Sequence, residues 1–341
     1  MGFGTVRVVR ECIKLIRPYG MLFLGFTPVF GALYNGQFDV FRLSLLLIIG
    51  LLGHIFVFVQ NDYYDIEIDR QSKYVVQRPL ISGVISRTHA RVLFLGSFVL
   101  SIVLAVIFFF SVLSFVALLL SFALMTLYNR YSKRIPGMEY VLGAGVFIYG
   151  IFGALTVSDQ VSNLAIIISC VWFLQWVFSV GVSANLKDVE FDTKLGIRTT
   201  PVVLGVNVLG NQLKKPLGFI IYPYAIKGAH LLVALLPFFL GYASIFLNGY
   251  PIPLLGFLVI AFLLLFTTRG ILTASLKERN LMLQYEGVHE GLALLLVPFV
   301  LLSYLVKHIG VLPTFLLMVL LVLWPLLSLR FLFGKTLIPL E

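Results

Sequence analysis

The sequence predicts an all-α membrane protein that crosses the bilayer many times. Of its 341 residues, 60% are apolar and only 12% are charged, whereas soluble domains carry about 25% charged residues. Many apolar runs reach or approach ~20 residues, the length of a helix that spans the hydrocarbon core. Lys and Arg also concentrate in alternate connections between these runs, as in loops on the cytoplasmic side of a membrane.

Ten apolar spans are expected along the chain. They lie near residues 20–36, 43–60, 91–110, 112–128, 138–157, 163–184, 229–247, 252–272, 290–307 and 311–333. The turn between the third and fourth spans contains neither Gly nor Pro, so its position depends on Ser111 and Ser114 alone. An even number of spans places both termini on one side of the membrane.

The distribution of positive charge gives the orientation. On this count, only Arg42 and Lys307 among the Lys and Arg residues lie outside. We therefore expect an integral, multi-pass protein of the cell membrane with its active site facing the cytoplasm. The formal charge of +10 has the same explanation, so nucleic-acid binding is not expected. Residues 1–17 show no cleavable signal, and Cys12 and Cys170 suggest no disulfide framework.

An acidic patch follows the second apolar span. It reads Asn61-Asp-Tyr-Tyr-Asp-Ile-Glu-Ile-Asp69 and holds four carboxylates. If the helix continues, Asn61, Asp65 and Asp69 recur every four residues and share one face. Like charges at this spacing repel one another, so the patch predicts a bound cation rather than a solvated helix end.

A second acidic patch follows the sixth span. Asn185, Asp188 and Asp192 come after the apolar run 164–184, and the two aspartates are again four residues apart. Seven of the fifteen acidic residues of the chain lie in the two patches. Oxygen ligands suit a hard cation such as Mg²⁺, which is commonly shared with substrate phosphates. The sequence therefore predicts a magnesium site.

Basic residues are interleaved with the patches: Lys73, Arg78, Lys133, Arg134, Lys194 and Arg198. Cations beside metal-binding carboxylates suit a polyanion bridged by metal, and a diphosphate fits best. Membrane orientation alone explains any single one of these charges equally well. Arg78 and Arg198 are the stronger candidates, because each follows its acidic patch and precedes a Pro within a few residues.

The spacing of the patches suggests an internal repeat. Each patch closes an even-numbered span and is followed by a basic segment containing Pro. We expect a single transmembrane domain over residues 1–341, built from two similar four-helix units at about 18–135 and 136–272 with C-terminal helices at 290–333. The similarity is too short to establish duplication.

These motifs resemble those of the UbiA-type intramembrane prenyltransferases. Asn61-Asp62-x-x-Asp65-x-x-x-Asp69 is similar to the first aspartate-rich motif of that family, and Asp188-x-x-x-Asp192 to the second. The segments Arg78-Pro-Leu-x-x-Gly83 and Tyr128-Asn-x-x-Ser-Lys133 also resemble it, over roughly residues 15 to 270. The resemblance implies a bundle of nine spans, or ten on the present count, around a central cavity capped by two motif-bearing cytoplasmic loops.

The resemblance also implies roles for individual residues. The expected metal ligands are Asn61, Asp62, Asp65, Asp69, Asn185, Asp188 and Asp192. The expected substrate-binding residues are Lys73, Arg78, Lys133, Arg198 and Asn129. Asp65, Asp188, Asp192 and Tyr128 are the expected catalytic residues, the tyrosine because an electron-rich ring can face an allyl cation.

The expected function is Mg²⁺-dependent transfer of an isoprenyl group from an allylic isoprenyl diphosphate, such as geranylgeranyl diphosphate, to a lipophilic acceptor within membrane lipid. An aromatic quinone precursor, a glycerol-phosphate ether-lipid precursor and haem are all acceptors in this family, and no motif selects among them. A transporter of divalent cations or polyprenyl phosphates predicts acidic residues at mid-membrane depth or on both faces. A terpene cyclase or diphosphate hydrolase predicts diphosphate release without an acceptor.

Polar residues within the spans have two interpretations. Gln175 and Ser179 could contact substrate or form hydrogen bonds between helices, and the second interpretation is at least as well supported. Glu286, His289 and Glu290 lie near the start of an expected span. They could help to bind an acceptor, but the sequence favours a solvated helix end there.

Overall fold

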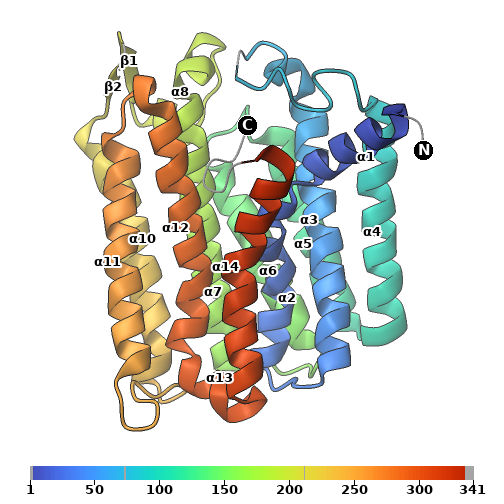
Figure 1. Cartoon of the computed structure of the whole chain (residues 1–341), viewed down its shortest axis with the longest axis vertical. Helices are drawn as coiled ribbons and strands as arrows, with labels where there is room; N and C mark the ends of the chain where they lie inside the picture. Colours follow the sequence, from blue (N-terminus) through green and yellow to red (C-terminus); the bar gives the residue numbers. More distant parts are fainter. Residues whose placement is uncertain (1–2, 73, 211, 335–341) are drawn as a thin grey trace.

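The computed structural model describes residues 3–72, 74–210 and 212–334, which form a bundle of roughly parallel helices (Figure 1). The helices are α1 (Phe3–Ile16), α2 (Met21–Tyr34), α3 (Val40–Asp69), α4 (Arg87–Phe109), α5 (Val112–Tyr131), α6 (Met138–Leu155), α7 (Asn163–Phe178), α8 (Asn185–Lys194), α9 (Thr200–Val203), α10 (Leu217–Phe239), α11 (Ile252–Thr273), α12 (Arg279–Val300), α13 (Leu302–Ile309) and α14 (Val311–Phe333). We call the end of the bundle that carries α1, α8 and the last turn of α14 the motif end.

Short elements complete the chain. They are two 3₁₀ turns, η1 (Pro18–Gly20) and η3 (Leu276–Glu278), a π-helical turn, η2 (Ser179–Ala184), and the strands β1 (Asn207–Leu209) and β2 (Gln212–Lys214). The strands pair antiparallel, with Val208 opposite Leu213. They form a small hairpin at the motif end (Figure 1).

The membrane-protein class is confirmed. Within the described ranges, eight helices are long and apolar enough to cross a membrane, or nine if α12 and α13, bent by 62°, count as one span. One of the eight is continuous over Asn163–Lys194 and joins α7, η2 and α8. The expected count of ten includes α2, whose 14 residues make it shorter than these spans. The division into two four-helix units remains a prediction.

Two expected span boundaries are wrong. The span expected at 229–247 begins at Leu217, and the one expected at 290–307 begins at Arg279. In both helices, charged residues that the hydropathy pattern assigns to a loop lie inside the helix. Lys227 is fully buried in α10, and its ammonium donates to Gln175 on α7. A charge with a partner inside the bundle does not end a helix, and hydropathy alone cannot detect the partner.

Side-chain caps explain several helix starts. Asp39, Ser86 and Ser162 each accept a hydrogen bond from the backbone N–H three residues ahead, at the starts of α3, α4 and α7. Ser111 and Ser114 form a reciprocal capping box at the start of α5. The predicted boundary between the third and fourth spans is therefore confirmed, and these two serines define it.

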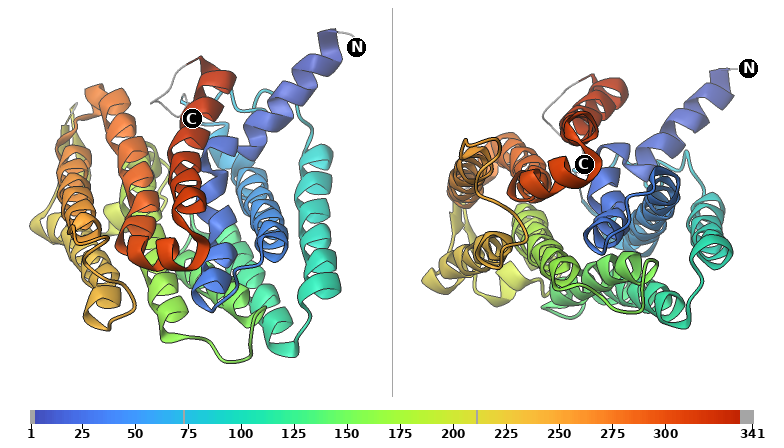
Figure 2. Two further views of the ribbon diagram at one scale, coloured as in Figure 1. Left: turned by 60° about the horizontal axis from the view of Figure 1, so that its bottom comes forward. Right: turned by 90° about the horizontal axis from the view of Figure 1, so that it is seen from below.

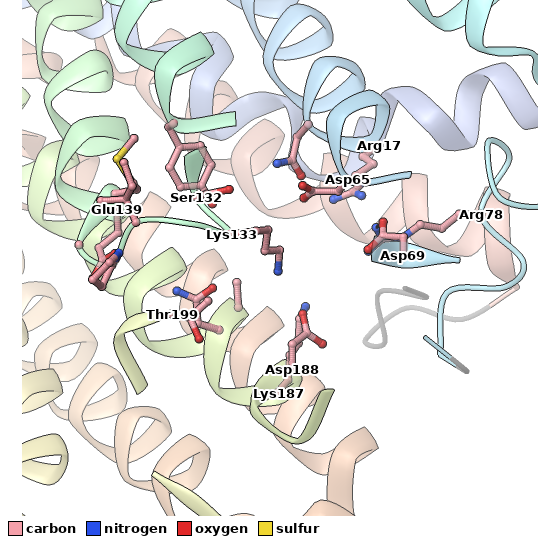
Figure 3. A pocket seen from close by; sticks show the side chains of 18 residues that line it. Arg17, Asp65, Asp69, Arg78, Ser132, Lys133, Glu139, Lys187, Asp188 and Thr199 are labelled. Carbon is pink, nitrogen blue, oxygen red and sulfur yellow. Dashed lines mark hydrogen bonds and ion pairs between the residues drawn. The ribbon is translucent and has the colours of Figure 1, made fainter. Parts of the chain in front are cut away.

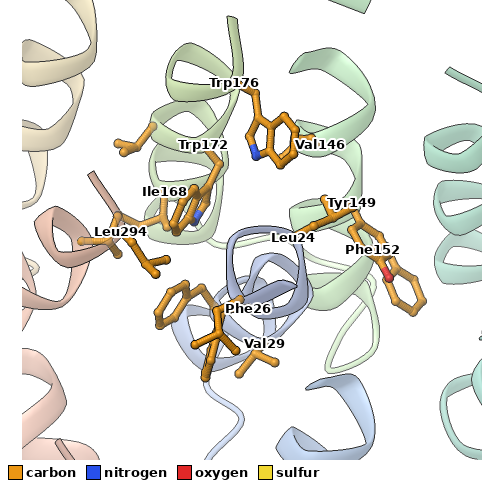
Figure 4. Close-up of a cluster of buried hydrophobic side chains, with 14 of the residues drawn as sticks. Leu24, Phe26, Val29, Val146, Tyr149, Phe152, Ile168, Trp172, Trp176 and Leu294 are labelled. Carbon is orange, nitrogen blue, oxygen red and sulfur yellow. The ribbon is translucent and has the colours of Figure 1, made fainter. Parts of the chain in front are cut away.

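Helix α2 lies in the middle of the bundle. Twelve of its 14 residues are buried. Its apolar side chains lie among those of α6, α7 and α12 (Figure 4), and Phe30 stacks on Trp172 with 6.1 Å between ring centroids. Seen along the helix axes, α3 and α4 lie on one side of the bundle and α10 and α11 on the other (Figure 2). This apolar centre supports the motif end above it.

Close backbone contact between α2 and α6 depends on glycine. A Cβ at Gly153 would overlap the backbone of Pro28, and one at Gly31 would overlap the carbonyl oxygen of Gly150. Small residues at such crossings are the usual means of close helix packing in membranes.

Replacing Gly153 by Ala should therefore destabilise the bundle by about 1–3 kcal/mol, because the added methyl group forces the two helices apart. Thermal unfolding in detergent measures the effect. Gly96→Ala on α4 is the matched control, since a Cβ there meets nothing within 4 Å. Equal midpoints for the two variants would contradict the close packing of α2 on α6.

Candidate active site

A polar pocket opens at the motif end, and segments far apart in sequence line it (Figure 3). Its walls are the end of α3, the loop after α3, the α5–α6 loop and the start of α8. The lining residues are Arg17, Asn61, Asp65, Asp69, Arg78, Tyr128, Ser132, Lys133, Ile135, Pro136, Gly137, Met138, Glu139, Ala184, Asn185, Lys187, Asp188 and Thr199. Both acidic patches therefore contribute to one pocket.

The first wall is the last part of α3. This helix runs on to Asp69, so Asn61, Asp65 and Asp69 share the face that lines the pocket. The four-residue spacing predicted this arrangement. Asp65 is only 8% exposed, and its carboxylate accepts no hydrogen bond from the part of the chain that the structure describes. Such a carboxylate suits a cation supplied from outside the chain.

The second wall is the start of α8, which carries Asn185 and Asp188. Arg279, at the start of α12, donates to Asp188 Oδ1 over 3.1 Å and also to the carbonyl oxygen of Lys187. Its guanidinium lies 4.1 Å from the ring centroid of Tyr74. The acidic residues thus lie on helix ends, whereas motif-bearing loops were expected.

Lys133 extends from the α5–α6 loop between the two walls (Figure 3). Its ammonium lies 3.7 Å from Asp192 Oδ1, and Thr199 donates to the other oxygen of Asp192 over 2.9 Å. Burial alone would lower the pKa of Lys133, but Asp192, Asp65 and Asp188 more than offset this and raise it. Lys133 is therefore a permanent cation at neutral pH, shared by the two acidic patches.

Two arginines that line the pocket pair with carboxylates of the first patch. Arg78 lies 2.5 Å from Asp69 Oδ2 and 3.4 Å from Asp62 Oδ1, and Arg17 lies 2.5 Å from the same Asp62 oxygen. The backbone of Arg17 is left-handed, with φ of 53°. That uncommon conformation lies at the junction of α1 and η1, where the chain turns its guanidinium toward α3.

The loop that carries Arg78 is a series of tight turns. The amides of Ile81 and Ser82 both donate to the carbonyl of Arg78, and Gly83 has φ of 74°, which favours glycine. Leu80 is buried beneath the loop. These features explain the Arg78-Pro-Leu-x-x-Gly83 pattern as a rigid support for one guanidinium.

Other expected site residues lie away from the pocket surface. Asp62 and Asp192 are buried behind its walls in the ion pairs described above. Arg198 is exposed and does not line the pocket. Lys73 lies outside the described residues. The roles expected for these four residues remain predictions.

Asn129 is buried, and its amide donates to the carbonyl of Val57 and to Gln60 Oε1, both on α3. These hydrogen bonds join α5 to α3, and Asn129 is not among the residues that line the pocket. Asn129→Ala should destabilise the protein by about 1–3 kcal/mol, because two buried acceptors lose their donor. The folded fraction should keep its substrate KM within about twofold. A large rise in KM at unchanged thermal stability would instead support the expected substrate-binding role.

Several pocket residues could not be predicted from the sequence. Glu139 is 3% exposed at the start of α6 and accepts hydrogen bonds from Thr200 and, over 3.1 Å, from Tyr222. Its partners come from α9 and α10, so no local spacing indicates the contact. Arg17, Ser132, Lys187 and Thr199 also line the pocket. Among these four, Ser132 carried a signal as part of the Tyr128-Asn-x-x-Ser-Lys133 segment, and Arg17 carried one as part of the basic segment before Pro18.

The donor set fits a hydrated hard cation. In the described part of the chain, no group of three or more His, Cys, Asp or Glu side chains is arranged to hold a metal alone. Asp65 on one wall and Asp188 on the other face a shared space, and Asp192 Oδ1 lacks a hydrogen-bond partner among the described residues. Mg²⁺ in particular binds through one or two carboxylates, waters and substrate phosphates. An anion with metal bound to it could join the two walls.

The chain is similar to several known proteins in sequence and in fold. The digeranylgeranylglyceryl phosphate synthase of Pyrococcus furiosus is 28% identical over 203 residues, covering 58% of this chain and 70% of the relative. The apo structure of a UbiA homologue from Aeropyrum pernix K1 superposes with a TM-score of 0.60 at 16% identity, covering 87% of this chain and 99% of the other.

A UbiA homologue from Archaeoglobus fulgidus bound to GPP and Mg²⁺ superposes with a TM-score of 0.53 at 16% identity, covering 94% of this chain and 99% of the other. The sequence model of the UbiA prenyltransferase family matches residues 22–285, a range that includes both acidic helix ends and the start of α12. The chain is a member of the UbiA prenyltransferase family.

Proposed function

We propose that this prenyltransferase uses Mg²⁺ to transfer a long isoprenyl group from an allylic diphosphate to a glycerol-phosphate ether lipid. The observation that carries the proposal is the meeting of two acidic helix ends and a partly buried lysine over one polar pocket. A diphosphate complements that arrangement, because its oxygens can contact Lys133 and Arg78 while bound metal joins it to the carboxylates.

Several residues each contribute to binding the diphosphate leaving group. Lys133 supplies a permanent positive charge between the two walls. Arg78, held by Asp62 and Asp69, presents a pre-oriented guanidinium at the rim. Asn61, Asp65, Asn185 and Asp188 would hold Mg²⁺, which when bound neutralises the diphosphate as a Lewis acid. These groups stabilise the charge that develops on the departing diphosphate.

In the reaction, the bond between the allylic carbon and the bridging oxygen breaks, and its electron pair leaves with the diphosphate. The acceptor hydroxyl oxygen then forms a bond to the same carbon, and its proton is released. Tyr128 lines the pocket from the end of α5 and offers an electron-rich ring to the allyl cation. The apolar centre around α2 gives the prenyl chain an environment that excludes water.

The named relatives support the choice of acceptor. A digeranylgeranylglyceryl phosphate synthase makes a lipid with two geranylgeranyl groups on glyceryl phosphate, so its last transfer joins a prenyl group to a hydroxyl of the singly prenylated lipid. We propose the same acceptor class here, in place of a quinone precursor. The bias of Lys and Arg toward the motif end supports a cytoplasmic active site within the cell membrane.

Purified protein in detergent, incubated with geranylgeranyl diphosphate and Mg²⁺, tests the proposal. The acceptors are geranylgeranylglyceryl phosphate and 4-hydroxybenzoate. A doubly prenylated lipid and stoichiometric diphosphate are expected with the first acceptor, and none with EDTA. Prenylation of the aromatic acid alone would assign the other acceptor class. Diphosphate release without any acceptor would indicate a cyclase or hydrolase. Mg²⁺ flux into proteoliposomes without turnover would indicate a transporter.

A further inference from the structure

A second polar network lies within the candidate membrane spans, and the proposed reaction does not use it directly. The ammonium of Lys227 on α10 donates to Gln175 Oε1 over 2.7 Å. The amide nitrogen of Gln175 donates to Glu290 Oε2 on α12 over 3.1 Å. Ser179 Oγ lies 2.6 Å from the other oxygen of Glu290. Lys227 and Glu290 therefore form an ion pair bridged by an amide across three helices.

The network has the features of a structural contact between helices. Its partners fix the orientation of the Gln175 amide, because Lys227 can only donate and an ionised Glu290 can only accept. Both oxygens of Glu290 have protein donors, and Lys227 also lies 4.2 Å from the ring centroid of Phe178. Charges within a membrane span are costly unless they are paired. We therefore expect this pair to hold neighbouring helix segments in place.

Ser179 is the first residue of the π-helical turn η2. At the end of that turn, the amide of Asn185 bonds to the carbonyl of Val180, five residues back. A π turn contains one residue more than an α turn, and each residue rotates a helix by about 100°. The turn therefore sets the direction in which Asn185 and Asp188 project relative to α7.

Neighbouring groups hold the rest of the turn. A Cβ at Gly181 would lie 2.9 Å from Glu139 Cγ and 3.1 Å from the hydroxyl of Tyr222, so only glycine fits there without displacement. Beyond the turn, Lys187 lies 3.6 Å from Glu286 Oε2. Glu286 and Glu290 are four residues apart on α12, so one face of that helix contacts the first residue of η2 and the first turn of α8.

We propose that Ser179 and Glu290 are positioning residues, which hold η2 in its π register so that Asn185 and Asp188 face Asp65 across the pocket. The inference rests on the proposed function for its chemistry. It predicts that metal binding depends on a hydrogen bond in the membrane-spanning part of the bundle. That dependence can be measured without turnover.

Ser179→Ala is the informative variant, because it removes the hydroxyl and leaves the charges of Lys227 and Glu290 paired through Gln175. Its matched control is Ser169→Ala on the same helix, where the buried hydroxyl bonds, among the described residues, only to the carbonyl of Ala165. Ser179→Thr keeps the hydroxyl and tests rescue. Binding of Mn²⁺, a paramagnetic hard cation, is measured by electron paramagnetic resonance with geranylgeranyl diphosphate present.

We expect the Mn²⁺ dissociation constant to rise about tenfold in Ser179→Ala, since partners that orient metal ligands affect affinity by this order. Ser169→Ala and Ser179→Thr should stay within twofold of the starting protein. Faster amide hydrogen exchange at 185–192 should accompany the loss.

Unchanged Mn²⁺ affinity in a folded Ser179→Ala protein would overturn the inference, as would an equal loss in Ser169→Ala. These outcomes differ from failure of the proposed function. That failure would appear as absent prenyl transfer in the starting protein, whatever the relative Mn²⁺ affinities of the variants.

Discussion

Replacing Asp65 by Asn is expected to lower prenyl transfer by about 10²–10³-fold while the bundle stays folded. Asp65 lines the pocket at 8% exposure, and its carboxylate accepts no hydrogen bond from the described residues, so no internal contact is lost. The amide has the same shape but lacks the charge that would hold Mg²⁺. The initial rate of lipid prenylation at saturating Mg²⁺ measures the effect.

Glu67→Gln is the control for this substitution. Glu67 is on the same helix, two residues further on, and its exposed carboxylate pairs with Arg70 and Arg87 at the surface. Exposed pairs of this kind contribute little to stability. Its turnover should match that of the unmodified protein. An Asp65→Asn enzyme as active as Glu67→Gln would remove Asp65 from the metal site.

Lys133→Ala is the second substitution with a large expected effect. Turnover should fall by about 10²–10³-fold, because the leaving diphosphate loses a cation that lies between both walls. The variant should also unfold at a lower temperature, since Asp192 is buried and loses its ion-pair partner. Arg134→Ala, one residue on and exposed, should change neither property.

The raised pKa of Lys133 fixes the pH range of its stabilising effect. A lysine whose pKa is higher in the folded protein contributes its full stabilisation below the unfolded value, and that contribution is lost as pH rises through the folded value. The difference in stability between Lys133→Ala and the unmodified protein should therefore not shrink from pH 6 to 8 and should shrink only in alkaline solution. A difference that shrinks between pH 6 and 8 would show that Lys133 titrates there.

The sequence predicted what depends on local spacing and on composition. The four-residue repeat of Asn61, Asp65 and Asp69 indicated one helix face, and that face lines the pocket. Ser111 and Ser114 marked a helix boundary without Gly or Pro, and they form its cap. Both features are read from residues a few positions apart, where chain geometry leaves few alternatives.

Contacts between distant segments could not be predicted in this way. Lys227 alone indicates a loop, because its partners Gln175 and Glu290 lie 52 and 63 positions away along the chain. Glu139 depends on Thr200 and Tyr222, and Asn129 on Val57 and Gln60. The cost of burying these groups depends on partners that only the fold supplies.

The central claim is that the two acidic helix ends bind one metal–diphosphate unit together. A double-mutant cycle tests it most directly: the affinity for geranylgeranyl diphosphate in the presence of Mn²⁺, measured by calorimetry for Asp65→Asn, Asp188→Asn and the double variant. If the ends act as a unit, each single variant should lose most of the binding free energy, and the double variant should lose little more. Losses that simply add, as for independent sites, would contradict the claim.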